Sequence, residues 1–167
     1  MERIEIPKSK FLFFLIKAKQ NTWAGNKKKI IRNDRSRNYY YKNGSFEYRD
    51  QYFGNLMDGG REIVYFQKKP IWIMCYHGGV LREQNVDSSL IFSILRKALL
   101  KPNKNFPVRG PLFLKWDKYI YRNKIYGNLY YFYGNEQISF KNKQIYLRAY
   151  IGGEIRDKRY CLILVEE

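Results

Sequence analysis

The sequence predicts an α+β fold, rich in β-strands, in which a unit of one helix and three strands is duplicated around a pseudo-twofold axis. The first observation is an internal repeat, because residues 48–56 (YRDQYFGNL) return as residues 121–129 (YRNKIYGNL). The second is a series of apolar stretches with either helical or alternating spacing. A repeat of this kind indicates one structural unit that is used twice.

Two segments carry apolar residues at the spacing of one helix face. The first lies within residues 9–25, and the second follows Asp87, a residue type that caps helix N-termini. Their apolar stripes are Phe11, Leu12, Phe14, Leu15 and Ala18 in the first segment, and Leu90, Ile91, Ile94, Leu95, Ala98 and Leu99 in the second. One helix is therefore expected before each copy of the repeat.

Alternating and apolar runs predict strands in the first copy near residues 46–51, 63–66 and 71–76. The run 71–76 (IWIMCY) is apolar throughout, which is typical of a central strand with both faces covered. Residues 67–70 have the composition of a tight turn.

The second copy has strand patterns near residues 116–122, 127–133, 136–141 and 144–151. The chain is long enough for one domain with a real core. We therefore expect a single domain over residues 1–167, made of repeats at about 9–80 and 88–155 and a C-terminal strand.

The chain has no run of 18 apolar residues, so we expect no transmembrane helix and no membrane partner. Cys75 and Cys161 lie in apolar, strand-like runs and indicate reduced thiols in the core. These features predict a cytoplasmic protein.

The charge is strongly positive, with 32 Lys and Arg against 15 Asp and Glu, a formal net charge of +17. The codon bias of an AT-rich genome would explain a high number of lysines, but it would raise the number of acidic residues too. The surplus therefore predicts a polyanionic partner, most simply RNA or DNA or a complex that contains nucleic acid.

The basic residues concentrate in the polar segment 26–44, which we expect to be a loop. Its cations can contact phosphates, and its three consecutive tyrosines offer faces on which bases stack. The alternative is a solvated loop whose tyrosines pack on the core. The candidate nucleic-acid-binding residues, with three more from the connection between the repeats, are Lys27, Lys28, Lys29, Arg32, Arg35, Arg37, Tyr39, Tyr40, Tyr41, Lys101, Lys104 and Arg109.

A second candidate site is an aromatic and acidic pocket. Asp50 and Glu62 belong to the first repeat, and Asn123 replaces the aspartate in the second, so only the first copy holds two acids. Two carboxylates could act as acid and base, hold a metal, or bind a cationic or hydroxylated ligand. The alternative is that Asp50 pairs with a surface arginine. The candidate ligand-pocket residues are Tyr48, Asp50, Glu62, Trp72 and Tyr76.

Evidence for catalysis is weak. His77 is the only histidine, and no second histidine or cysteine pair lies near it to form a zinc site. The candidates for a small ribonuclease are His77, Glu62 and Asp50. We expect no cofactor and no metal, and a binding module rather than an enzyme.

Several motifs resemble a bacterial family known as domain of unknown function 5680, over about residues 11–155. They lie in residues 22–26 (TWAGN), 36–37 (SR), 48–54 (YRDQYFG), 60–64 (GREIV), 70–76 (PIWIMCY), 109–112 (RGPL) and 150–153 (YIGG). Members that stand alone or are attached to helix-turn-helix regulators imply a sensing or accessory role. The chain departs from the family in its basic segment 26–44 and in Cys75, where an asparagine is expected.

The sequence therefore favours a basic, cytoplasmic nucleic-acid-binding module of a bacterium or phage, with a regulatory, toxin-antitoxin or mobile-element accessory role. A homodimer is compatible with it. The alternatives are a small-molecule-sensing domain with its cleft between the repeats, and a small ribonuclease. A groove lined by residues 27–42 and 101–124 would favour nucleic acid, whereas a closed aromatic pocket with Asp50 and Glu62 would favour a sensor.

Overall fold

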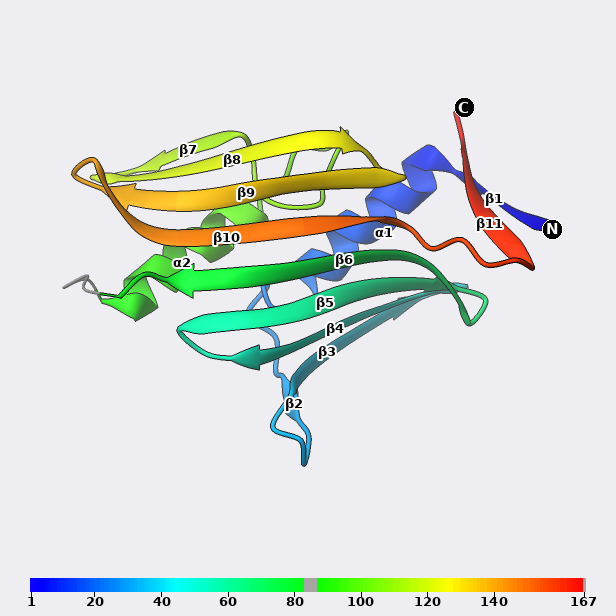
Figure 1. The fold of residues 1–167 in the computed structure, drawn as a ribbon, viewed down its shortest axis with the longest axis horizontal. Helices are drawn as coiled ribbons and strands as arrows, with labels where there is room; N and C mark the ends of the chain where they lie inside the picture. The colour runs from blue at the N-terminus through cyan, green and yellow to red at the C-terminus, as the bar shows by residue number, and fades with distance from the viewer. Residues whose placement is uncertain (83–86, 167) are drawn as a thin grey trace.

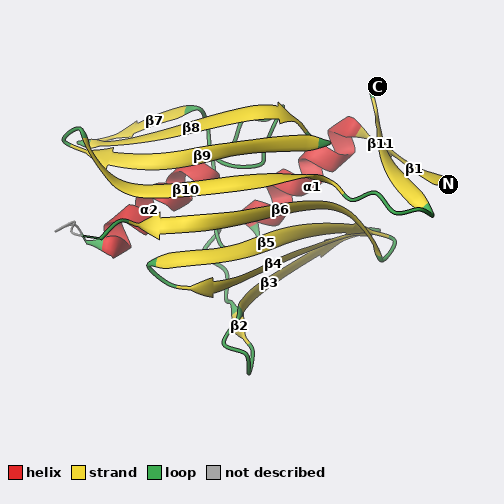
Figure 2. Cartoon of the chain, viewed as in Figure 1, coloured by secondary structure: helices red, strands yellow, loops and turns green. Residues whose placement is uncertain are grey.

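The computed structural model describes residues 1–82 and 87–166, and these form one long, antiparallel nine-stranded sheet with two helices on one of its faces (Figures 1 and 2). The sheet order is β2-β3-β4-β5-β6-β10-β9-β8-β7. The helices are α1 (Lys8–Gln20) and α2 (Ser88–Leu99). The strands of the sheet are β2 (Ile30–Ile31), β3 (Arg37–Asn43), β4 (Phe46–Gly54), β5 (Met57–Phe66), β6 (Lys69–Val80), β7 (Phe113–Trp116), β8 (Tyr119–Asn128), β9 (Tyr131–Phe140) and β10 (Lys143–Glu154).

The two ends of the chain form a separate parallel pair, β1 (Glu2–Pro7) with β11 (Tyr160–Val165). This pair lies beside the N-terminal end of α1 in Figure 1. Within the described residues, neither helix has the length and apolar character needed to cross a membrane.

The predicted fold class is wrong. The described chain is mostly β, and its strands build one continuous sheet rather than two helix-plus-three-strand α+β units. The strands are longer than the sequence pattern indicated, since β6 and β10 each contain 12 residues, and these two strands pair directly. β3 and β7 also add a strand at each side that the pattern did not reveal.

Most of the segment expected to be a basic loop is part of the sheet. β3 pairs with β4 along its whole length, so its tyrosines alternate between the two faces. Tyr39 is buried, Tyr41 is half-buried and Tyr40 is exposed. Three consecutive tyrosines thus cannot form one stacking platform, and the loop is confined to residues 26–29 and the β2–β3 turn.

The core lies between the helices and the sheet. Trp72 of β6 is fully buried, packs against Phe11 of α1 and Phe132 of β9, and donates a hydrogen bond from Nε1 to the Leu129 carbonyl, 3.0 Å away. The expectation that both faces of this strand are covered is wrong, because Cys75 is exposed on the other face. Cys161, in contrast, is buried as expected.

The tight turn predicted within residues 67–70 forms the hairpin β5–β6, and the hairpin β9–β10 has a turn of the same kind. Gln67 and Lys68 have φ of 49° and 67°, and Lys141 and Asn142 have φ of 47° and 65°. Two-residue hairpin turns need this left-handed backbone because it matches the twist of the strands. The hairpins hold β5, β6, β9 and β10 in fixed register, which sets the positions of the polar residues described next.

Candidate ligand pocket

A small pocket lies between the C-terminal ends of both helices and the inner face of the sheet. Its cavity has a volume of about 30 Å³, enough for about two waters or a few non-hydrogen atoms of a ligand. It is lined mostly by charged and aromatic residues, which come from α1 and the segment after it, from β4, β5, β6 and β10, and from the end of α2 and the connection after it. They are Lys19, Thr22, Trp23, Ala24, Tyr48, Asp50, Tyr52, Asp58, Glu62, Tyr76, Leu99, Arg109 and Arg148.

Strand register brings the two acids of the first repeat together. Asp50 of β4 lies directly opposite Glu62 of β5, and residues opposite each other in an antiparallel pair point to the same face. Both side chains face the helices and are buried, with exposed fractions of 6% and 3%. The alternative that Asp50 is a surface residue paired with Arg49 or Arg61 is therefore wrong.

The other acids of the pocket are held by cations. Lys19 Nζ lies 2.5 Å from Glu62 Oε2, and Arg109 lies 3.7 Å from the second oxygen of Glu62. Arg148 Nη2 lies 2.6 Å from Asp58 Oδ1. All of these side chains are nearly inaccessible to solvent, so each ion pair offsets a large cost of removing charge from water.

Asp50 differs from these acids because no cation lies within salt-bridge distance of it in the described structure. Its partner is the Tyr76 hydroxyl, which donates a hydrogen bond of 2.6 Å to Oδ1. Burial, and then the negative charge of Glu62, raise the pKa of Asp50 to about 7. Asp50 therefore exchanges its proton near neutral pH.

The balance of buried charges explains why the pKa of Asp50 is raised. We use the name buried charge cluster for seven side chains: the cations Lys19, Arg109 and Arg148 and the acids Asp50, Asp58, Glu62 and Glu136. Without Asp50, three cations balance three acids. Ionised Asp50 adds one negative charge with no counter-charge, and a buried unpaired charge is costly. The cluster is electrically neutral only while Asp50 holds its proton or while a cation enters the pocket.

Two arginines beside the pocket have unpaired donors. The Nε atoms of Arg109 and Arg148 are inaccessible to solvent and have no hydrogen-bond partner among the described residues. Because solvent does not reach them, these atoms do not line the cavity themselves, although both residues border it. The acceptor that the site offers is Asp50.

The second half of the sheet has a closed counterpart of this site. Asn123 lies opposite Glu136, as Asp50 lies opposite Glu62. The Tyr150 hydroxyl donates to Asn123 Oδ1 over 2.5 Å, and the Asn123 amide donates to the Gly110 carbonyl over 3.1 Å. Both polar ends of Asn123 are thus satisfied without charge.

Glu136 is fully enclosed and well supplied with donors. It binds Arg109 and accepts hydrogen bonds from the hydroxyls of Tyr121 and Tyr146, at 2.7 and 3.1 Å. Burial opposes its ionisation, but Arg109, Arg148 and the Tyr121 hydroxyl together hold the pKa of Glu136 below its ordinary value. Arg109 therefore links Glu136 to the Glu62 side of the cluster.

Four of the five residues predicted for the pocket line it: Tyr48, Asp50, Glu62 and Tyr76. Trp72 does not, because it belongs to the core. Lys19, Asp58 and Arg148 also line the pocket and were not predicted from the sequence. Two of these carried a readable signal. Lys19 follows Leu15 by four residues on the apolar helix stripe, and Arg148 alternates with the buried Tyr146 and Tyr150 on β10.

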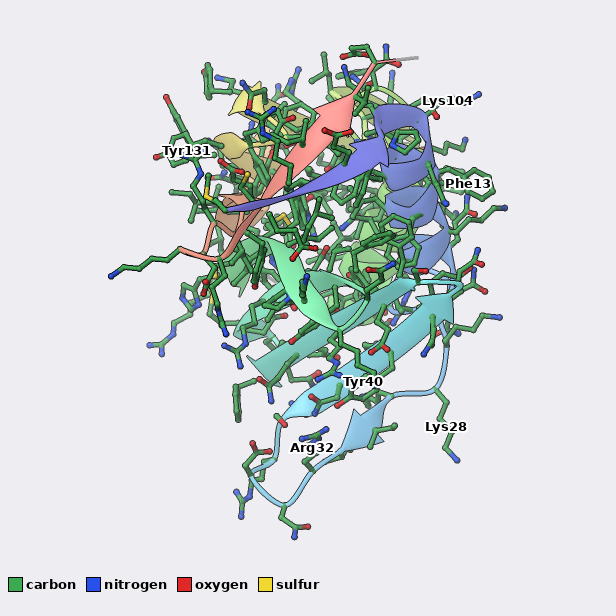
Figure 3. The ribbon with its side chains drawn as sticks, turned by 90° about the vertical axis from the view of Figure 1, so that its right-hand side faces the viewer. Phe13, Lys28, Arg32, Tyr40, Lys104 and Tyr131 are labelled. Carbon is green, nitrogen blue, oxygen red and sulfur yellow. The ribbon has the colours of Figure 1, made fainter. Side chains whose placement is uncertain are left out.

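The predicted nucleic-acid residues are not gathered in one place. Lys27, Lys28 and Lys29 are exposed on the loop before β2, while Lys101 and Lys104 are exposed after α2. Figure 3 shows Lys28 and Lys104 far apart along the helix side of the molecule, and Arg32 and Tyr40 near its lower edge. Arg109 was wrongly expected to contact phosphates: it is 3% exposed and belongs to the buried charge cluster.

The ribonuclease residues do not assemble either. His77 follows Tyr76 on β6, and alternation along the strand points the two side chains to opposite faces. Tyr76 faces the helices and His77 is exposed on the open face. His77 therefore cannot act together with Glu62 or Asp50 on one substrate bond.

Comparison with known proteins gives one match. A search of curated proteins and a search of solved structures found no match to the chain. The model of the family described as "Domain of unknown function (DUF5680)" matches residues 50–155. This range holds Tyr76 and six of the seven residues of the buried charge cluster, and it excludes Lys19 and the basic segment before β4. The chain belongs to the DUF5680 family.

Proposed function

We propose that the pocket binds a small primary amine and that the protein is a non-enzymatic sensor domain. The observation that carries the proposal is Asp50, a buried acid without a cation in an otherwise balanced cluster. A protonated amine supplies the missing positive charge and up to three N–H donors. Its binding allows Asp50 to lose its proton while the cluster stays neutral.

The size and donor pattern of the site narrow the ligand class. A cavity of about 30 Å³ admits a small amine of a few non-hydrogen atoms rather than a nucleotide or sugar. Arg109 and Arg148 line the pocket, and their guanidinium groups favour a neighbouring hydroxyl or carbonyl oxygen on the ligand. Small amino alcohols such as ethanolamine satisfy both requirements.

A metal ion fits the site less well. Hard cations such as Ca²⁺ and Mg²⁺ need about six or more oxygen ligands. Glu62 is already bound by Lys19, and Asp58 by Arg148, which leaves Asp50 as the available carboxylate. A monovalent organic cation needs only that one acid.

The range of the family match supports the pocket as the functional site. It includes the acids, Tyr76, Arg109 and Arg148, and it excludes residues 27–42, from which most of the predicted nucleic-acid contacts came. Nucleic-acid binding through that segment stays a prediction. A cytoplasmic location and a regulatory role are part of the proposal.

Thermal shift measurements with ethanolamine, methylamine and acetate at pH 6, 7 and 8 test the proposal. We expect the two amines to raise the melting temperature of the wild type and acetate to leave it unchanged, because ligands that bind only the folded state stabilise it. The effect should grow from pH 6 to pH 8 as Asp50 becomes easier to ionise. Asp50→Asn is the matched control, since the chain already carries asparagine at the corresponding position 123. Equal shifts for wild type and Asp50→Asn would overturn the proposal.

A further inference from the structure

The face of the sheet away from the helices is open. Side chains of one row across this face are paired in register from β5 to β8: Arg61 with Cys75, Cys75 with Ile151, Ile151 with Tyr133, and Tyr133 with Tyr126. All five are exposed. Figure 3 shows Tyr131, which belongs to the same face, on the side of the sheet opposite to Phe13 of α1.

One edge of this face contains a groove with three arginines. Its volume is about 140 Å³, and it is lined by Arg32, Asn38, Tyr40, Arg49, Gln51, Arg61, Ile63 and Tyr65. Among the described residues, no carboxylate lines it. The hydrogen bond of Arg61 to Gln51, at 3.4 Å, and the contact of Arg49 with Glu47, at 3.5 Å, are both long. These guanidinium groups therefore retain most of their capacity to bind phosphate.

Aromatic rings accompany the arginines. The Arg32 guanidinium lies 5.9 Å from the ring of Tyr40, and that of Arg49 lies 4.6 Å from the ring of Tyr65. At the far side of the open face, Tyr126 and Tyr133 are stacked on each other with ring centroids 5.4 Å apart. Exposed rings beside cations provide surfaces on which unpaired bases stack.

Nearly all charged residues on the open face are basic. On the described strands from β4 to β8, the open face carries a single acid, Glu47. Cations face the same side on several strands: Lys42, Arg49, Arg61, Arg122 and Lys124. Between the arginine groove and the tyrosine pair lies an apolar strip that contains Cys75 and Ile151. The distance from β4 to β8 is about 24 Å at the usual spacing of strands, the span of a short single-stranded segment.

We propose that the open face binds single-stranded nucleic acid, with phosphates in the arginine groove and bases on the exposed tyrosines. Double-stranded helices hide their bases, so the tyrosines favour single strands. This site is separate from the amine pocket, because the two lie on opposite faces of the sheet. It also differs from the surface expected from the sequence, since Arg49, Arg61, Tyr126 and Tyr133 take the place of the lysine loop.

Fluorescence anisotropy with a labelled 20-nucleotide oligouridine and a duplex of equal length tests the proposal. The double variant Arg49→Ala/Arg61→Ala should weaken binding and reduce the slope of log affinity against log salt by about 1.4, from two lost phosphate contacts on a single strand. Tyr133→Ala should weaken binding of the single strand about fivefold or more and affect the duplex less.

The matched control is Lys101→Ala/Lys104→Ala, which removes the same charge from exposed residues on the helix side. It should leave the salt slope unchanged, and all variants should melt like the wild type because the substituted residues are exposed. Equal losses for the two double variants would show only a general effect of charge and would overturn the proposal. A stable dimer in sedimentation that dissociates with Ile151→Lys, without binding of oligouridine, would also overturn it, because a second copy would then occupy the face.

Discussion

Asp50 and Asn123 occupy corresponding positions in the two halves of one sheet, but Asp50 lines a pocket whereas Asn123 does not. Each residue lies opposite a glutamate on the next strand and accepts a hydrogen bond from a tyrosine hydroxyl, Tyr76 for Asp50 and Tyr150 for Asn123. Asn123 is neutral and satisfied. Ionised Asp50 carries one negative charge more than the three cations of the buried charge cluster balance.

The pH dependence of the free energy of unfolding should reveal the raised pKa of Asp50. Its pKa is raised from 3.8 to about 7 on folding, so the folded state holds a proton that the unfolded state has lost between these values. Its contribution to stability is therefore present below about pH 4 and declines as the pH rises towards 7. Relative to the wild type, Asp50→Asn should gain up to about 1.4 kcal/mol per pH unit in this window. Urea denaturation of both proteins at pH 5, 6, 7 and 8 measures the difference, and a difference that stays constant with pH would contradict the raised pKa.

The reverse exchange, Asn123→Asp, should destabilise the protein at neutral pH. It removes the amide that donates to the Gly110 carbonyl and leaves that acceptor without its partner, which costs about 1–3 kcal/mol. The new acid also lies opposite the buried Glu136, which adds repulsion. The loss should shrink below pH 5, where the new carboxyl is protonated. Chemical denaturation at pH 4.5 and 7.5 checks this, and equal losses at the two pH values would count against a charge effect.

Lys19→Met should be strongly destabilising although it adds an apolar residue to a buried position. It leaves Glu62 with the more distant Arg109 as its nearest cation, and breaking a buried ion pair costs about 3–5 kcal/mol. The double variant Lys19→Met/Glu62→Gln should recover a large part of this loss. Lys17→Met on the same helix is the control and should change the free energy of unfolding by less than about 0.5 kcal/mol. A Lys19→Met variant as stable as this control would show that the pair is not needed.

Trp72→Ala should cost about 3–5 kcal/mol, since Trp72 is fully buried and hydrogen-bonded to the Leu129 carbonyl. Trp116→Ala, which truncates an exposed tryptophan on β7, should cost much less. Thermal melts of the two variants provide the comparison. A Trp72→Ala variant that melts within a degree or two of the wild type would show that this residue does not hold α1 and β9 to the sheet.

The sequence predicted the pocket better than the fold. The proximity of Asp50 and Glu62 could be predicted because alternation and the repeat placed them on adjacent strands. The asparagine at position 123 showed that only the first copy has two acids. The continuous sheet could not be predicted from the sequence, because the pairing of β6 with β10 joins residues about 70 positions apart along the chain. Such pairing depends on strand register rather than on local pattern. Polar composition hid β3, whose tyrosines alternate between core and solvent. Arg109 looked like a surface cation because its partners, Glu62 and Glu136, come from distant strands.

The most direct test of the central claim is proton release when ethanolamine binds, measured by isothermal titration calorimetry at pH 6 in two buffers with different ionisation enthalpies. Because the pKa of Asp50 is about 7, this carboxyl is mostly protonated at pH 6, and the entering ammonium group should displace its proton. We expect release of about 0.9 proton per ligand from the wild type, and no heat of binding from Asp50→Asn. Binding without proton release, or binding that Asp50→Asn retains, would contradict the claim that Asp50 is the acceptor of the ligand's positive charge.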